Sequence, residues 1–146
     1  MKLLRHGPRG QEKPGILDAE GTIRDLSGHF EDINGATITP DSLAKLASID
    51  FDSLSAVDGS TRIGACVGDI GKFMCIGLNY TDHAEETGHP IPEEPILFAK
   101  FNSAICGPDD NIIMPRSSTK LDWEVELGVV IGTEGKYISE ADALDY

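Results

Sequence analysis

The sequence has few basic residues, few cysteines and no long hydrophobic run. Its 146 residues carry 12 Lys+Arg against 25 Asp+Glu, which gives a formal net charge of −13. A chain this acidic has no basic face that could neutralise phosphates, so we expect no binding to nucleic acid. No segment approaches the ~20 consecutive apolar residues that span a bilayer, so we expect no membrane association.

The first residues also lack the features of a secretory signal. Residues 1–8 include positive charge but no apolar core and no small-residue cleavage site, so a cytoplasmic protein is expected. The three cysteines, Cys66, Cys75 and Cys106, are an odd number without a C-x-x-C spacing, so they indicate no zinc or redox motif. In a cytoplasmic protein we expect them to be reduced packing residues.

Short strands, turns and one helix are predicted for the first part of the chain. Residues 2–6 are predicted to form an edge strand, and residues 15–17 and 22–26 a hairpin whose loop ends in glycine. Thr39 precedes a proline and an apolar-periodic stretch, so it is predicted to be the N-cap of a helix over residues 40–49. One apolar face of this helix contains Leu43, Leu46 and Ala47.

The composition changes near residue 70, which predicts a small N-terminal domain over residues 1–70 and a second domain over residues 71–146. A nearly continuous apolar run over residues 72–79 predicts a buried strand. Asp82 and Glu85 have the spacing of a capping box and predict a helix start. Further elements are expected at residues 96–100, 112–114 and 123–131 as strands, and from Ser139 as a capped helix. The chain ends within this last helix, so we expect a fragment of a longer protein.

Two acidic residues at alternate positions of a predicted strand are candidate metal ligands. Glu124 and Glu126 share one face of the strand over residues 123–131, opposite the apolar face. Carboxylates spaced roughly 7 Å apart can share an ion, and oxygen ligands favour Mg²⁺, Mn²⁺ or Ca²⁺ over Zn²⁺. The alternative is an amphipathic strand whose acidic face meets water, with Lys120 as a partial counter-charge.

A second candidate pair lies on the predicted helix after residue 80. His83 and Glu86 are three residues apart, so imidazole and carboxylate share one helix face. A carboxylate can orient an imidazole and stabilise its protonated form while the imidazole takes a proton from water. The alternative is an exposed His–Glu pair on the surface without a catalytic role.

Three motif-bearing segments follow one another along the chain: Ile-Gly-Leu-Asn-Tyr-Thr-Asp-His-Ala-Glu-Glu (residues 76–86), Pro-Ile-Leu-Phe-Ala-Lys (95–100) and Asp-Trp-Glu-Val-Glu-Leu-Gly-Val-Val-Ile-Gly (122–132). In this order they resemble the fumarylacetoacetate hydrolase family. The resemblance covers residues 70–146, and residues 1–70 resemble the small N-terminal domain that many members carry. Within the family, the chain most resembles the bacterial branch of 2,4-diketo-3-deoxy-L-rhamnonate hydrolases, also named ureidoglycolate lyases.

This resemblance implies an α+β fold, in which a small N-terminal α/β domain precedes the first part of a mixed β-roll catalytic domain. It also implies a homodimer and a bound Mg²⁺ or Mn²⁺ ion. By position in the motifs, Glu124 and Glu126 match the metal-binding pair, His83 and Glu86 match the dyad that activates water, and Lys100 matches a basic residue near the substrate. The third metal ligand of the family, an Asp on a later strand, falls beyond residue 146.

The resemblance implies metal-dependent hydrolysis of a C–C bond in a 2,4-dioxo acid, such as an acylpyruvate or a diketo-deoxy sugar acid. The metal would chelate the 2-oxo acid, and the dyad would activate water. Ureidoglycolate lyase, 2-oxo acid decarboxylase or isomerase chemistry at the same site is the alternative enzyme reading. A truncated, inactive cation-binding module is the alternative that is not an enzyme.

Overall fold

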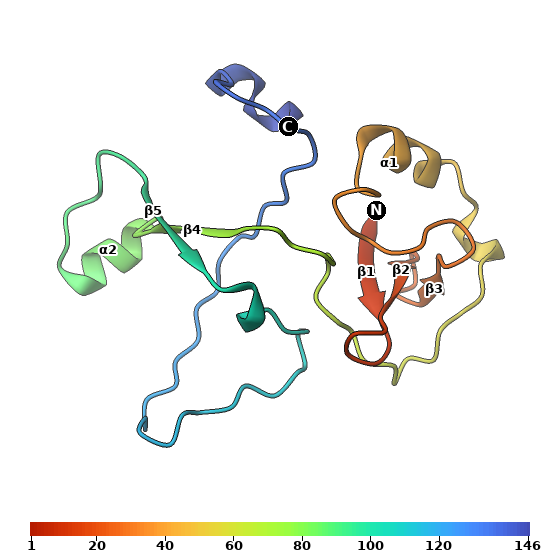
Figure 1. Ribbon diagram of the computed structural model, residues 1–146, viewed down its shortest axis with the longest axis horizontal. Helices are drawn as coiled ribbons and strands as arrows, with labels where there is room; N and C mark the ends of the chain where they lie inside the picture. Colours follow the sequence, from red (N-terminus) through yellow and green to blue (C-terminus); the bar gives the residue numbers. More distant parts are fainter. The chain divides into compact units, whose positions relative to one another are not determined.

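The computed structural model describes residues 1–146, which form a small mixed α/β structure with short helices and two small sheets (Figure 1). The chain divides into two compact units. The first contains Met1–Gly68 and Cys106–Tyr146, and the second contains Asp69–Ile105. No helix has the length and apolar character that crossing a membrane would require. The division into domains 1–70 and 71–146 stays a prediction.

The first unit is built on a three-stranded antiparallel sheet in the order β1-β2-β3. Strand β1 spans Lys2–His6, β2 spans Lys13–Leu17 and β3 spans Ile23–Asp25. The predicted edge strand and hairpin are therefore confirmed. The loop between β2 and β3 includes Gly21 at φ +83°, a left-handed conformation that glycine adopts without steric cost.

One face of this sheet packs on helix α1 (Pro40–Ala47) and on the short 3-10 helix η1 (Phe51–Ser53). The N-cap prediction is confirmed, because the Thr39 side chain accepts a hydrogen bond from the Ser42 backbone N–H. Leu46 is buried and contacts a core that includes Ile16 and Leu26. The predicted apolar face is narrower than expected: Leu43 is partly buried, while Ala47 is exposed to solvent.

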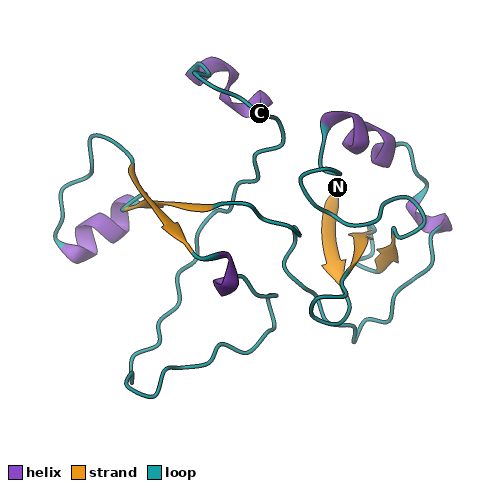
Figure 2. Cartoon of the chain, in the orientation of Figure 1, coloured by secondary structure: helices purple, strands orange, loops and turns teal.

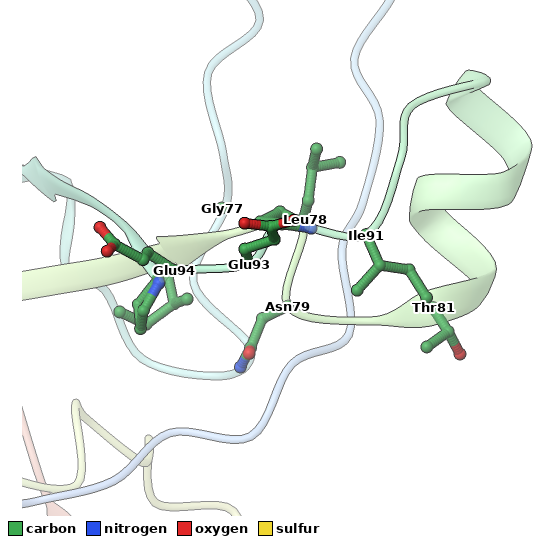
Figure 3. A pocket seen from close by; sticks show the side chains of 10 residues that line it. Gly77, Leu78, Asn79, Thr81, Ile91, Glu93 and Glu94 are labelled. Atoms are coloured by element: carbon green, nitrogen blue, oxygen red, sulfur yellow. The ribbon is translucent and has the colours of Figure 1, made fainter.

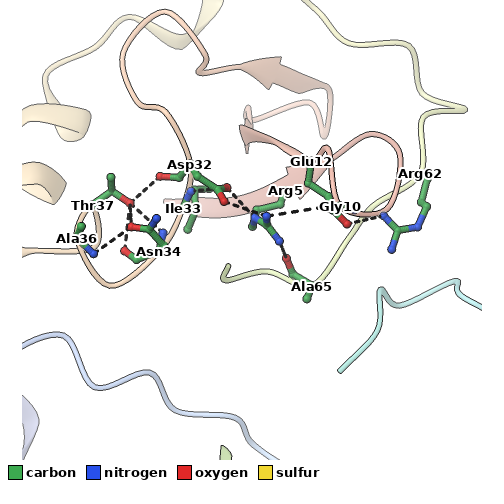
Figure 4. A network of polar contacts seen from close by, with 10 residues as sticks. All are labelled: Arg5, Gly10, Glu12, Asp32, Ile33, Asn34, Ala36, Thr37, Arg62 and Ala65. Carbon is green, nitrogen blue, oxygen red and sulfur yellow. Dashed lines mark hydrogen bonds and ion pairs between the residues drawn. The ribbon is translucent and has the colours of Figure 1, made fainter. Parts of the chain in front are cut away.

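A polar network ties the strands of the first unit to segments distant in the sequence (Figure 4). The Arg5 guanidinium donates to both carboxylate oxygens of Asp32, at 2.7 and 2.9 Å. Glu12 lies between two guanidinium groups, 3.7 Å from Arg5 Nη2 and 2.9 Å from Arg62 Nη1. Because these two guanidinium groups flank it, the Glu12 carboxylate, whose side chain is 8% exposed, is compensated on both sides.

Arg62 also binds the segment that returns from the second unit. Its Nε and Nη2 atoms each donate to one oxygen of Asp110 at 2.6 Å, the bidentate geometry that strengthens such pairs. The Asp110 carboxylate in addition accepts from the Gly107 backbone N–H at 2.8 Å. The hydrogen bonds from Arg62 lower the pKa of Asp110 to about 2 and raise the pKa of Arg62 above its usual range.

The second unit is a two-stranded antiparallel sheet of β4 (Phe73–Gly77) and β5 (Ile96–Lys100), with helix α2 (Thr81–Thr87) between them and the 3-10 helix η2 (Asn102–Ala104) after them. The predicted strand at residues 72–79 is confirmed, but its predicted burial is wrong. Phe73 is 38% exposed, because β5 is the only strand that pairs with β4. Helix α2 begins after Tyr80 without a side-chain cap, so the predicted capping box is also wrong.

Residues 107–139 contain no strand, as the long loop in Figure 2 shows. The predictions of strands at 112–114 and 123–131 are therefore wrong for this chain. A strand forms only when a neighbour pairs with its backbone N–H and C=O groups, and no neighbouring strand meets these residues. The predicted helix start at Ser139 is present as the 3-10 helix η3 (Glu140–Asp145), with the Ser139 side chain as its cap.

We expect the Arg62–Asp110 pair to make the stability of the chain depend on acid pH. The depressed pKa of Asp110 means that its stabilising effect is complete above the ordinary carboxyl value of 3.8 and is lost as the pH falls toward about 2. Asp110→Asn should lower the urea unfolding midpoint at pH 7 and flatten its fall between pH 4 and 2.

Asp109→Asn is the matched control, because the neighbouring Asp109 is exposed. The control variant should keep the unfolding midpoint and the acid dependence of the unchanged chain. Equal midpoints for the two variants across this pH range would contradict the stabilising role of the pair.

Candidate functional site

The turn from β4 into α2 has a close backbone approach and one left-handed residue. A Cβ at Gly77 would lie 3.3 Å from the Ile96 Cγ2 atom, so glycine lets β5 approach the end of β4. Leu78 follows with φ +50°, a conformation that is sterically costly for a leucine. Such residues are maintained by their surroundings and are frequent at functional sites. No pattern in the sequence indicates this conformation.

The two residues of the predicted dyad lie on helix α2. His83 and Glu86 are one helical turn apart and both are exposed, whereas Ala84 between them is buried. The His83 backbone N–H donates to the Asp82 carboxylate at 2.9 Å, and the His83 carbonyl accepts from the Thr87 hydroxyl at 2.8 Å. These bonds hold the backbone of the helix, and they leave the imidazole open to solvent and to a substrate.

A pocket of about 270 Å³ lies at the turn between β4 and α2 (Figure 3). The end of β4, the first residue of α2 and the loop over residues 91–95 line it. Its polar groups include the Asn79 amide, the Thr81 hydroxyl and the carboxylates of Glu93 and Glu94. Thr81 lines this pocket two residues before His83, so the pocket and the dyad share the beginning of one helix. A small polar ligand would fit this volume.

Lys100 ends strand β5, where it pairs with Phe73 at the beginning of β4. It therefore lies at the end of the two-stranded sheet away from Gly77 and Ile96, which pair at the other end. Lys100, His83 and Glu86 all belong to the second unit. Within that unit, the sheet and α2 carry all three predicted side chains.

The predicted metal ligands, Glu124 and Glu126, belong to the first unit and are exposed. They lie in the segment without strand pairing, and the apolar residues that alternate with them are exposed too, with Trp123 at 80% and Leu127 at 82%. Two carboxylates offer the oxygen atoms that Mg²⁺, Mn²⁺ or Ca²⁺ prefers, so their chemistry fits such an ion. They fill only part of the six positions that Mg²⁺ requires.

An acidic cluster that the sequence analysis missed lies elsewhere in the first unit. Oxygen atoms of Asp18, Glu20 and Asp52 lie within 4.8 Å of one another. Asp18 already accepts from Arg24 Nε at 2.7 Å and from the Thr22 backbone N–H at 2.8 Å. Its pKa is lowered, because these hydrogen bonds outweigh the opposing effect of burial. The cluster joins positions far apart in the sequence, so no local motif could reveal it.

Residues 72–146 match the family described as "Fumarylacetoacetate (FAA) hydrolase C-terminal". The matched region covers half of the chain and contains the dyad, Lys100 and both predicted metal ligands. The chain belongs to this family. The bacterial branch named in the sequence analysis is a finer assignment and stays a prediction.

Several Burkholderia proteins are similar to the chain over its whole length. A protein of Burkholderia ambifaria strain MC40-6 named "Putative hydrolase" is 61% identical over all 146 residues, which cover 52% of that protein. A protein of Burkholderia lata with the same description is 60% identical, with the same coverage of both chains. The chain therefore spans about half the length of the curated relatives it matches.

We expect Glu124 and Glu126 to bind a hard divalent cation in a protein of the relatives' full length. The double variant Glu124→Gln/Glu126→Gln removes both charges and nearly conserves shape, so its affinity for Mn²⁺ in calorimetry should fall strongly. Glu134→Gln/Glu140→Gln, which changes two other exposed carboxylates, is the control and should bind as before. Unchanged Mn²⁺ affinity in the first variant would rule out these ligands.

Proposed function

We propose that the full-length protein hydrolyses a C–C bond in a 2,4-dioxo acid, such as an acylpyruvate or a diketo-deoxy sugar acid. The observation that carries this proposal is the family match over residues 72–146, which contains every residue of the candidate site. The two Burkholderia relatives named "Putative hydrolase" also support the proposal. The pocket at the beginning of α2 adds a place for a small polar ligand in the same unit as the predicted dyad.

In this proposal His83 is the general base. Its exposed imidazole takes a proton from water, and the water oxygen attacks the carbonyl carbon distant from the 2-oxo acid group. The Glu86 carboxylate, one turn along α2, orients the imidazole and stabilises its protonated form. The bond between that carbonyl carbon and the carbon on the side of the 2-oxo acid then breaks. This second carbon takes up the proton held by the His83 imidazole, which yields a carboxylic acid and a 2-oxo acid.

Glu124 and Glu126 hold Mg²⁺, Mn²⁺ or Ca²⁺ in this scheme, in keeping with a family that generally binds a divalent metal. Such an ion, when bound, supplies a Lewis acid that polarises the 2-oxo acid group and stabilises the negative charge left by cleavage. The Lys100 ammonium binds the carboxylate of the substrate by charge attraction. We further propose a homodimer for the full-length protein.

Ureidoglycolate lyase, 2-oxo acid decarboxylase and isomerase reactions would use the same groups on other substrates. Product analysis distinguishes them, because hydrolysis alone adds water and yields two acids. Carbon dioxide from a 2-oxo acid, or urea from ureidoglycolate, would replace the hydrolase proposal with one of these alternatives.

His83→Ala should lower kcat on an acylpyruvate by roughly 10²–10⁴-fold, the usual contribution of a positioned general base. Affinity for Mn²⁺ should be retained, because the imidazole is not a metal ligand in this scheme. His89→Ala is the matched control, since His89 is exposed in the loop after α2. Wild-type turnover of the His83 variant between pH 6 and 8 would show that another group is the base.

Residues 1–146 alone should show no C–C hydrolase activity. Two exposed carboxylates in a segment that forms no strand should hold Mg²⁺ weakly, so millimolar Mg²⁺ should leave the melting temperature unchanged. A chain extended to the relatives' length should melt at a higher temperature with Mg²⁺. Cleavage of acylpyruvate by the monomeric 146-residue chain would mean that the site is placed wrongly.

A further inference from the structure

Two segments of the first unit meet where the chain leaves for the second unit and returns from it. We call this meeting point the neck, formed by residues 62–68 and 106–110. The backbones are in direct contact there. A Cβ at Gly107 would lie 3.2 Å from the Gly64 Cα atom and would clash with the Ile63 carbonyl oxygen. Only a glycine at position 107 permits this approach.

The outgoing segment of the neck is fixed on both sides of Cys66. The Gly64 N–H donates to the Arg5 carbonyl at 2.8 Å, and the Gly68 N–H donates to the Ile33 carbonyl at 2.7 Å. Between them, the Ala65 carbonyl accepts from Arg5 Nη1 at 3.5 Å. The backbone that carries Cys66 is therefore held in place.

The returning segment is fixed next to Cys106. Gly107 follows directly, and its N–H donates to the Asp110 carboxylate at 2.8 Å. Arg62, on the outgoing segment, holds the same carboxylate through two hydrogen bonds of 2.6 Å. The two segments are thus joined by a bidentate ion pair within a few residues of both cysteines.

Both cysteines lie next to the backbone contact of the neck. In the first unit Gly64 contacts Gly107. Cys66 follows Gly64 by two residues, and Cys106 directly precedes Gly107. The two thiols are therefore carried by backbone segments that meet within two residues of each cysteine.

The structure also corrects the expectation that the cysteines are packing residues. Cys66 and Cys106 are both exposed, and only Cys75, on β4, is partly buried. Both thiols of the neck are therefore accessible to small oxidants, and neither is needed to fill the core.

We propose that Cys66 and Cys106 are a redox site and form a reversible disulfide across the neck on reaction with a low-molecular-weight disulfide such as oxidised glutathione. One cysteine thiolate attacks a glutathione sulfur, so a mixed disulfide forms and one glutathione thiol leaves. The second thiolate attacks the mixed disulfide at the protein sulfur and releases the second glutathione. Two electrons pass from the cysteines to glutathione, and the two thiol protons end on the released glutathione.

The bond would tie together the two ends of the segment that carries β4, α2 and β5. Its exposure at the surface is typical of labile, regulatory disulfides rather than of permanent structural ones. The proposal does not depend on the proposed hydrolase function, because it concerns only the geometry of the neck.

The test is a disulfide map of the 146-residue chain in a glutathione redox buffer at pH 7.4. After thiols are blocked with N-ethylmaleimide, trypsin cuts behind Arg62, Lys72, Lys100 and Arg116, which leaves each cysteine on its own peptide. We expect one linked species that joins peptides 63–72 and 101–116. It should be absent in Cys66→Ser and Cys106→Ser and unchanged in the control Cys75→Ser.

Two further measurements separate a pairing imposed by the fold from chance. In a denaturant all three cysteine pairs should form, and the preference for Cys66–Cys106 should disappear. Asp110→Asn breaks the ion pair with Arg62. The effective concentration of the Cys66 and Cys106 thiols for each other, measured against glutathione, should then fall about tenfold. Links to Cys75 at equal yield, glutathione adducts alone, intermolecular dimers, or a native pattern equal to the denatured one would each overturn the proposal.

Discussion

The arrangement of the first unit depends on one guanidinium group. Arg62 binds Glu12 from the turn between β1 and β2 and Asp110 from the returning segment, over sequence separations of 50 and 48 residues. Closing loops of this length costs chain entropy, and a planar group with five donors can offset part of that cost by binding two carboxylates at once. Glu12 links this group to Arg5 and Asp32, so one network joins the sheet to both sides of the neck.

Local chemistry predicted much of the first unit correctly. Thr39 before a proline caps α1, and short stretches next to glycine turns form β1, β2 and β3, because each of these features acts within a few residues. The sequence failed where an element depends on distant partners. Trp123 and its neighbours alternate as in a strand but have no strand beside them. The apolar run of β4 pairs with β5 alone, so it is only partly buried.

In the candidate site, too, local features could be predicted from the sequence, and features that depend on distant segments could not. The i, i+3 spacing of His83 and Glu86 predicted a shared helix face, and α2 provides one. The left-handed Leu78 and the pocket in front of α2 could not be predicted, because both depend on how the loop over residues 91–95 returns against the end of β4. The cysteines of the neck were misjudged for a related reason: composition predicts the average burial of a cysteine, and the fold decides where each one lies.

The segment over residues 121–131 contains both exposed apolar side chains and the two predicted metal ligands. Its apolar side chains alternate with Glu124 and Glu126. If the segment joined a sheet as a strand beside a partner strand, the apolar side chains would lie on one face and could be buried, and the spacing of the two carboxylates on the other face would be fixed. The chain spans about half the length of its relatives, so much of their sequence is available to supply such a partner. Pairing and metal binding would then stabilise the same backbone conformation, and each would favour the other. Such coupling would account for an acidic, apolar segment that is exposed here and has the residue pattern predicted for a metal site.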